Sequence, residues 1–152
     1  MTSLLPRSLA KNLLLLSLTV FFSHGLFQAA SARDWVAAFG TADCEDCAAV
    51  KRQWRDELTA PDDPVLIFLD IAHPPNYRLL DAIENSLQTA AKGQSFPIFL
   101  AGDRLITGID ELYDLGDELF QLAAKPSNLA ATAPLQTAAA NAKTPVFDLF
   151  CT

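Results

Sequence analysis

The 152-residue sequence predicts an α/β domain with a mixed four-stranded sheet and helices on both faces. Short apolar segments alternate with segments whose apolar residues recur at helical spacing, in the order strand, helix, strand, helix, strand, strand, helix. A right-handed crossover makes the first two strands parallel neighbours, and the closing hairpin adds an antiparallel edge. Hydrophobic residues make up 51% of the chain, which is enough for a buried core and argues against wholesale disorder.

The first strand leads directly into the first helix. Residues 34–40, D-W-V-A-A-F-G, are apolar and end in glycine, which is typical of a buried strand. From Cys44 to about Leu58 apolar residues recur at helical spacing, and the prolines within residues 60–64 end that helix. We expect Asp43 to be the N-cap, because an Asp side chain accepts a hydrogen bond from a free N–H group of the first turn.

The remaining elements follow in order along the chain. The continuous apolar run at residues 65–71, V-L-I-F-L-D-I, fits a central parallel strand that is buried on both faces. Residues 76 to about 91 predict an amphipathic helix with leucines on one side. Residues 97–107 predict a hairpin of two short strands around a Gly-Asp turn, and residues 109 to about 123 predict the last helix.

The first 32 residues have the layout of a secretory signal peptide. Arg7 and Lys11 precede the apolar run 13–22, and the small residues A-A-S-A end at the expected cleavage point. The run is about half as long as a bilayer requires, and a retained N-terminal anchor is the alternative. Cleavage leaves nine basic against 18 acidic residues, a formal charge of −9 that argues against a nucleic-acid surface.

The chain after the domain of residues 33–124 has a different composition. Residues 125–144 are rich in Ala, Thr, Asn and Pro and predict a flexible linker. Residues 145–152 resemble a further strand and contain the third cysteine. They are either the start of a second, truncated copy of the domain, or a frayed tail or edge strand docked on the one domain.

The chemistry of the chain centres on Cys44 and Cys47 in the stretch T-A-D-C-E-D-C. Residues three apart lie on one helix face, so the two thiols can form a disulfide. Cys44 lies at the helix start, where free N–H groups and the helix dipole favour a thiolate, the species that attacks disulfides. Cys47 lies one turn deeper and is suited to resolve a mixed disulfide. In an exported protein such a pair is a disulfide or a dithiol kept reduced by a partner.

Two other interpretations of the pair are less favoured. A structural disulfide across so short a loop would stabilise the fold little. A zinc site needs four ligands, and after cleavage only Cys44, Cys47, Cys151 and His73 remain, without a second pair at ligand spacing. We therefore expect no metal and no cofactor, and Cys151 is either free or pairs between chains.

Pro97 is the second element of the expected site. It opens a strand in S-F-P-I-F-L, a position where a missing N–H group is tolerated. If the Phe96–Pro97 bond is cis, the chain bends tightly to face the helix start, and the backbone of Phe96 can pair with an extended substrate. The alternative is an ordinary trans proline at an edge strand.

These residues together resemble the thioredoxin superfamily, and its glutaredoxin-like branch most closely. The resemblance rests on Cys-x-x-Cys after the first strand, on Phe96-Pro97 before the hairpin, and on G-D-R-L-I-T-G-I-D-E-L within it and after it. Residues 69–80, L-D-I-A-H-P-P-N-Y-R-L-L, are similar to a segment of exported bacterial thioredoxin-like domains. The resemblance covers about residues 34–122.

The resemblance implies a thioredoxin-like fold and a thiol-disulfide oxidoreductase in the periplasm, or anchored in the membrane and facing the periplasm. It implies Cys44 as nucleophile, Cys47 as resolving thiol and Pro97 as the cis proline beside them. Thr107 and Gly108 correspond to the loop with which glutaredoxins hold the carboxylate end of glutathione. The implied partners are protein thiols or disulfides and a soluble or membrane-bound redox partner that resets the pair.

Three departures from the family pattern refine this expectation. Glu45-Asp46 stands between the cysteines, no Lys or Arg directly precedes Cys44, and Ala38 stands where thioredoxins keep a buried acid. The departures count against glutathione as substrate. The acids disfavour a thiolate on Cys44, so we expect a reductant or isomerase more than a strong oxidant. The competing classes are a non-catalytic thioredoxin-like binding module with a stable disulfide, or the N-terminal part of a longer tandem protein.

Overall fold

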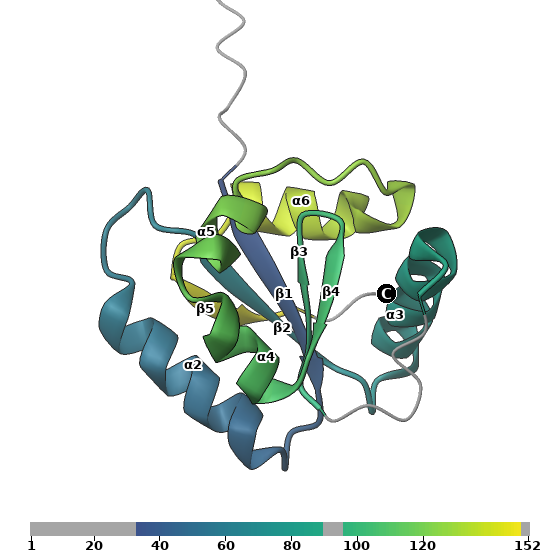
Figure 1. The fold of residues 1–152 in the computed structure, drawn as a ribbon, viewed down its shortest axis with the longest axis horizontal. Helices are drawn as coiled ribbons and strands as arrows, with labels where there is room; N and C mark the ends of the chain where they lie inside the picture. Colours follow the sequence, from purple (N-terminus) through teal and green to yellow (C-terminus); the bar gives the residue numbers. More distant parts are fainter. Residues whose placement is uncertain (1–32, 90–95, 150–152) are drawn as a thin grey trace, which may run out of the picture. The chain divides into compact units, whose positions relative to one another are not determined.

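The computed structural model describes residues 33–89 and 96–149, so the expected signal peptide and Cys151 lie outside the described residues. Within them one mixed sheet has the strand order β4-β3-β1-β2-β5 (Figure 1). The strands are β1 (Trp35–Gly40), β2 (Val65–Asp70), β3 (Ile98–Ala101), β4 (Arg104–Thr107) and β5 (Val146–Asp148). The helices are α2 (Glu45–Glu57), α3 (Pro74–Leu87), α4 (Gly108–Leu115), α5 (Asp117–Ala123) and α6 (Ala133–Ala140), with a 3-10 turn at Ala130–Thr132.

Strand β1 is the centre of the sheet. It pairs in parallel with β2 after the crossover through α2, and it pairs antiparallel with β3 of the β3–β4 hairpin. These pairings confirm the predicted mixed sheet. The predicted number of four strands is wrong for the described residues, because β5 adds a fifth strand that pairs in parallel with β2.

Side chains of β1 alternate between two hydrophobic cores, one on each face of the sheet. Val36 and Ala38 pack with residues of α2, α4 and α5 in the first core. Trp35, Ala37 and Phe39 pack with residues of α3 and α6 in the second. The structure therefore has helices on both faces of the sheet, as predicted (Figure 1).

The segment after α5 differs from the flexible linker that its composition predicts. Residues 130–140 form the 3-10 turn and α6, and Leu135 and Ala139 are buried against the second core. The Gln136 side chain donates a hydrogen bond to the backbone carbonyl of Ser127, which holds the start of the segment to the helix. Beyond it, β5 matches the alternative of an edge strand docked on the one domain.

Two helix boundaries also differ from the prediction. The last predicted helix is two helices, because Gly116 has φ 46° and ψ −124°, a conformation outside the helical region that suits glycine. Helix α3 begins at Pro74 because proline fits the first helical positions, where no intrahelical N–H bond is lost. Among the described residues no helix has the length and apolarity that crossing a bilayer requires.

Candidate redox site

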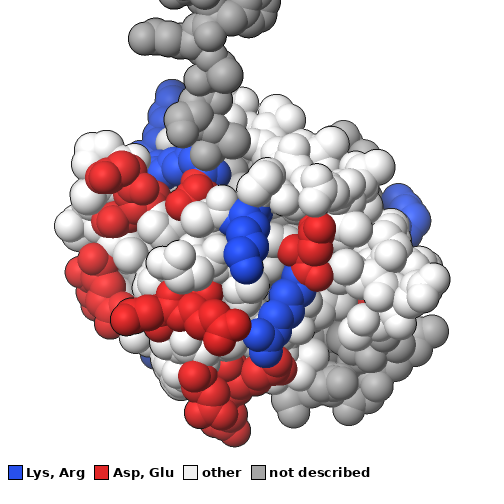
Figure 2. All heavy atoms as spheres, turned by 45° about the horizontal axis from the view of Figure 1, so that its top comes forward, with Lys and Arg blue, Asp and Glu red and all other residues white. Residues whose placement is uncertain are grey.

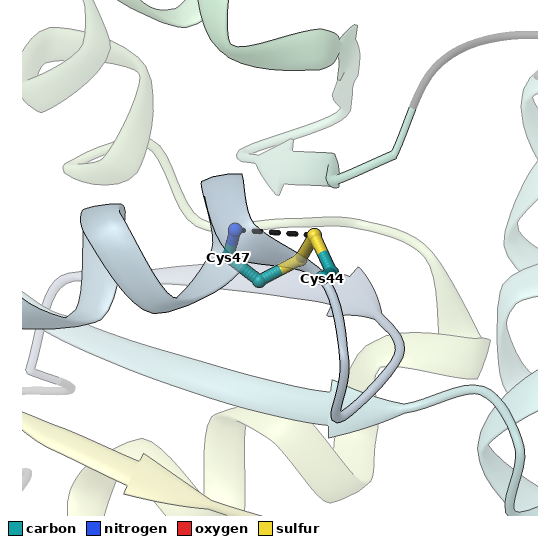
Figure 3. Close-up of a disulfide and its surroundings, with 2 residues drawn as sticks. All are labelled: Cys44 and Cys47. Carbon is teal, nitrogen blue, oxygen red and sulfur yellow. Dashed lines mark hydrogen bonds between the residues drawn. A yellow bond between two sulfur atoms is a disulfide. The ribbon is translucent and has the colours of Figure 1, made fainter.

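Cys44 and Cys47 form a disulfide, with a sulfur–sulfur distance of 2.07 Å and a Cα–Cα distance of 5.2 Å (Figure 3). The pair is positioned by the turn that joins the end of β1 to the start of α2. The pair follows the first strand and opens a helix, as the sequence predicts, and it lies near the end of β1 where the parallel strand β2 also ends.

Cys44 itself is the N-cap of α2, and its Sγ accepts a hydrogen bond from the backbone N–H of Cys47 at 3.1 Å (Figure 3). The expected cap, Asp43, is wrong by one residue, because α2 begins at Glu45 and the side chain that accepts from its first turn is that of Cys44. A sulfur in this position accepts a hydrogen bond and also lies at the positive end of the helix dipole. Both interactions favour a thiolate when the disulfide is reduced.

The two sulfur-bearing residues differ in exposure. Cys47 is 4% exposed and belongs to the first hydrophobic core together with Val50 and Phe68, whereas Cys44 is partly exposed. An external thiol or disulfide therefore meets Cys44 first. This asymmetry fits one attacking and one resolving cysteine.

Gly40, the last residue of β1, determines how closely α2 can approach the sheet. An ideal β-carbon built on Gly40 would lie 2.5 Å from Sγ of Cys47 and 3.5 Å from Cε2 of Phe68. The absence of a side chain therefore makes room for the buried sulfur. In the sequence this glycine indicates only the end of a strand, so its contact with Cys47 was missed.

Pro97 lies at the same edge of the sheet. The Phe96–Pro97 peptide bond is cis, which is the condition that the sequence analysis set for a tight bend. Ile98 pairs with Phe39, so Pro97 comes level with Gly40 at the edge where the disulfide lies. Phe96 remains 40% exposed, whereas Pro97 is buried.

Thr107 and Gly108 lie next to Pro97, but their backbone donors are engaged. The N–H of Gly108 donates to the carbonyl of Pro97 at 2.8 Å. The N–H and the hydroxyl of Thr107 both donate to Oε2 of Glu111, at 2.9 and 3.1 Å. The backbone hydrogen bond from Thr107 holds the pKa of Glu111 below its usual value. A substrate carboxylate would have to displace Glu111 to reach Thr107.

The disulfide has acidic side chains around the start of α2 and a lysine one turn further along the helix. Asp43, Glu45 and Asp46 are exposed around the helix start, and a hydrogen bond from the Thr41 side chain lowers the pKa of Asp43. Lys51, one turn beyond Cys47, makes an ion pair with Asp148 of β5. Its Nζ also lies 3.5 Å from the centroid of the Phe68 ring. The sequence analysis missed Lys51, because its partner is 97 residues away.

Of the other residues considered for a metal site, Cys151 lies outside the described residues, which leaves His73. His73 is the N-cap residue of α3, on a different helix from the cysteines. Within residues 33–89 and 96–149, no group of three or more His, Cys, Asp or Glu side chains is placed to bind a metal ion.

The fold and the site together define a small α/β domain that carries a Cys-x-x-Cys disulfide at the start of a helix. Comparison with protein-family models, with curated proteins and with solved structures finds no match. The function therefore has to be argued from the residues of the site.

Proposed function

We propose that the chain is an exported thiol-disulfide oxidoreductase with a thioredoxin-like fold. One observation carries the proposal: the disulfide joins a partly exposed Cys44, whose sulfur accepts the N–H of Cys47 at the start of α2, to a buried Cys47. A disulfide that closes so short a loop contributes little to stability. Its place at a helix start, on the other hand, suits reversible thiol chemistry.

The proposed cycle starts from the dithiol. The Cys44 thiolate attacks one sulfur of a target disulfide, forms a mixed disulfide and releases the other target sulfur as a thiolate. Cys47 loses its proton and attacks Cys44, which forms the Cys44–Cys47 disulfide and releases the second target sulfur. Two electrons pass to the target, and a partner dithiol returns the chain to its reduced form.

The substrate is proposed to be an extended protein segment that docks beside Phe96 and Pro97. Phe96 is exposed, and the strand register brings Pro97 level with Gly40 at the disulfide edge. The backbone of Phe96 precedes the first paired residue of β3, and we propose that an added segment forms its main-chain hydrogen bonds there.

Glutathione is a less suitable substrate than a protein. The donors of Thr107 and Gly108 that would hold its carboxylate are engaged with Glu111 and Pro97. Three carboxylates near Cys44, on Asp43, Glu45 and Asp46, also repel a substrate that carries net negative charge.

The same carboxylates support a proposal for the direction of electron flow. Negative charge disfavours the Cys44 thiolate, and a less stable thiolate makes the disulfide relatively more stable. We therefore propose a reductant or isomerase, with periplasmic or periplasm-facing location, in preference to a strong oxidant.

Reduction of insulin with dithiothreitol as electron source tests the proposal. The wild-type protein should accelerate insulin precipitation, and Cys44→Ser should abolish the acceleration. Cys47→Ser should keep the attack but trap a mixed disulfide with insulin, visible on a non-reducing gel. If wild type and Cys44→Ser act alike, the chain is instead a binding module with a stable disulfide.

A further inference from the structure

A cavity of about 180 Å³ lies between the C-terminal half of α2 and the α4–α5 pair. Its walls include Gln53, Trp54 and Glu57 from α2, and Tyr113, Asp117 and Phe120 from α4 and α5. Trp54 is ten residues beyond Cys44, which corresponds to about 15 Å along a helix. The cavity is therefore separate from the candidate redox site, and the inference below does not depend on the redox cycle.

Aromatic rings form much of this cavity. The Trp54 and Phe120 ring centroids are 6.2 Å apart with the planes tilted by 39°. Tyr113 and Phe120 are 52% and 37% exposed, and they are two of the four exposed large hydrophobic side chains of the described residues. The Tyr113 hydroxyl donates to Oε1 of Gln53 at 2.8 Å, which joins the two walls. Exposed aromatic side chains gathered around a cavity indicate an interaction site.

The charges that line the cavity have one sign. Glu57 and Asp117 supply two exposed carboxylates, and the described lining residues include no Lys or Arg. Arg52 and Arg55 also lie on α2 but are not among the residues that line the cavity, and Lys51 is paired with Asp148 of β5. Figure 2 shows Asp and Glu side chains gathered over the part of the surface that belongs to the helices at the lower left of Figure 1. The complementary ligand is therefore a cation.

We propose that this cavity binds the guanidinium group of an arginine side chain from a basic partner protein. A planar guanidinium can stack on aromatic rings and bond to carboxylates at the same time, which a compact ammonium does less well. Sites for drug-sized ligands have volumes of about 300–1,000 Å³. The smaller volume found here suits a single side chain.

Titration of the isotope-labelled protein with short peptides, followed by NMR, tests this proposal. The probe is an acetylated and amidated peptide with one arginine flanked by glycine and serine. Matched peptides carry lysine or the uncharged citrulline in its place. The arginine peptide should saturate shift changes of the backbone amides of residues 53–57 and 112–120. At low salt the lysine peptide should bind several-fold more weakly, and the citrulline peptide should cause no saturable change.

Variants of the protein test separately the two groups proposed to bind the guanidinium, a carboxylate and an aromatic ring. Glu57→Gln and Phe120→Leu should each weaken binding of the arginine peptide several-fold, and Asp81→Asn on α3 should leave it unchanged as a matched control. Glu57 is exposed, so its variant keeps the fold even if Phe120→Leu does not. Equal binding of arginine and citrulline peptides, equal binding of arginine and lysine peptides, or no saturable shifts in the two segments would each overturn the proposal.

Discussion

Sγ of Cys47 lies only 2.5 Å from the position that a β-carbon on Gly40 would occupy. Real β-carbons do not approach a sulfur so closely. A side chain at residue 40 would therefore overlap the volume that Sγ of Cys47 occupies. The backbone of Gly40 does not have a positive φ, so a side chain is excluded there by the sulfur and not by the backbone conformation. The fit between strand β1 and helix α2 therefore depends on this residue pair.

Gly40→Ala should destabilise the oxidised protein by about 1–3 kcal/mol, because the added methyl group overpacks the core at Cys47. The same substitution in a Cys47→Ala background should be neutral or stabilising by about 0.4–1 kcal/mol, because the sulfur is gone and alanine restricts the unfolded chain. Urea denaturation of the four proteins of this double-mutant cycle measures the coupling. If Gly40→Ala lowered the free energy of unfolding equally in the two backgrounds, the added methyl group would not clash with the Cys47 sulfur.

Replacement of Glu45 by Gln and Asp46 by Asn should make the redox couple less reducing. Two unit charges about 8 Å apart in water interact by about 0.5 kcal/mol. Loss of both carboxylates therefore favours the Cys44 thiolate by about 1 kcal/mol, which lowers the pKa of its thiol. The reduction potential should rise by on the order of 20 mV. Equilibration with glutathione buffers measures the potential, and the pH dependence of alkylation measures the pKa.

Asp56→Asn is the matched control for this pair of substitutions. Asp56 is exposed on the same helix, three turns from Cys44, so the charge change is screened. Its potential should equal that of the wild type. A rise as large as that of the double variant would mean that overall charge, and not the residues between the cysteines, sets the potential.

The sequence predicted the core of this fold because the signals there are local. Strand β1, helix α2 and strand β2 lie within about one residue of the predicted boundaries, since an apolar run, a helical repeat and prolines specify them. Helix α6 could not be predicted, because its Ala-rich and Thr-rich segment has little pattern and only Leu135 and Ala139 are buried in it. Contacts of the site such as Gly40 with Cys47 depend on packing between elements, which no spacing in the sequence reveals.

Lys51→Ala should destabilise the protein more than Asp148→Ala. The ion pair of these residues has side chains that are 19% and 50% exposed, so loss of Asp148 should cost only about 0.2–1 kcal/mol. Loss of Lys51 also removes its contact with the Phe68 ring, worth about 0.5–1 kcal/mol. Urea denaturation measures the free energy of unfolding of both variants. An equal loss in the two would mean that the contact of Lys51 with the Phe68 ring contributes nothing to stability.

The same two variants should move the reduction potential in opposite directions. Lys51 lies one turn beyond Cys47, so its positive charge favours the Cys47 thiolate and hence the reduced form. Lys51→Ala should make the couple more reducing, whereas Asp148→Ala should make it less reducing. Shifts of the same sign would show that loss of β5 packing, and not charge, causes them.

Glu111 should link the stability of the hairpin and α4 to pH. Its Oε2 accepts hydrogen bonds from the N–H and the hydroxyl of Thr107, and Arg104 lies against its Oε1 at 3.3 Å. The backbone hydrogen bond from Thr107 is the main reason that the pKa of Glu111 in the folded protein is lowered from 4.5. Glu111→Gln keeps the size of the side chain but removes the charge that these donors stabilise.

A carboxyl group whose pKa is lowered by folding contributes stability that is fully present above its unfolded pKa. The contribution is lost as the pH falls through the lower, folded-state pKa. The wild type should therefore be more stable than Glu111→Gln at pH 7, and the difference should shrink as the pH falls below about 4.5. Urea denaturation of both proteins between pH 7 and pH 3 measures the difference. A gap that stays constant over this range would show that the Glu111 carboxylate does not gain from its contacts with Thr107.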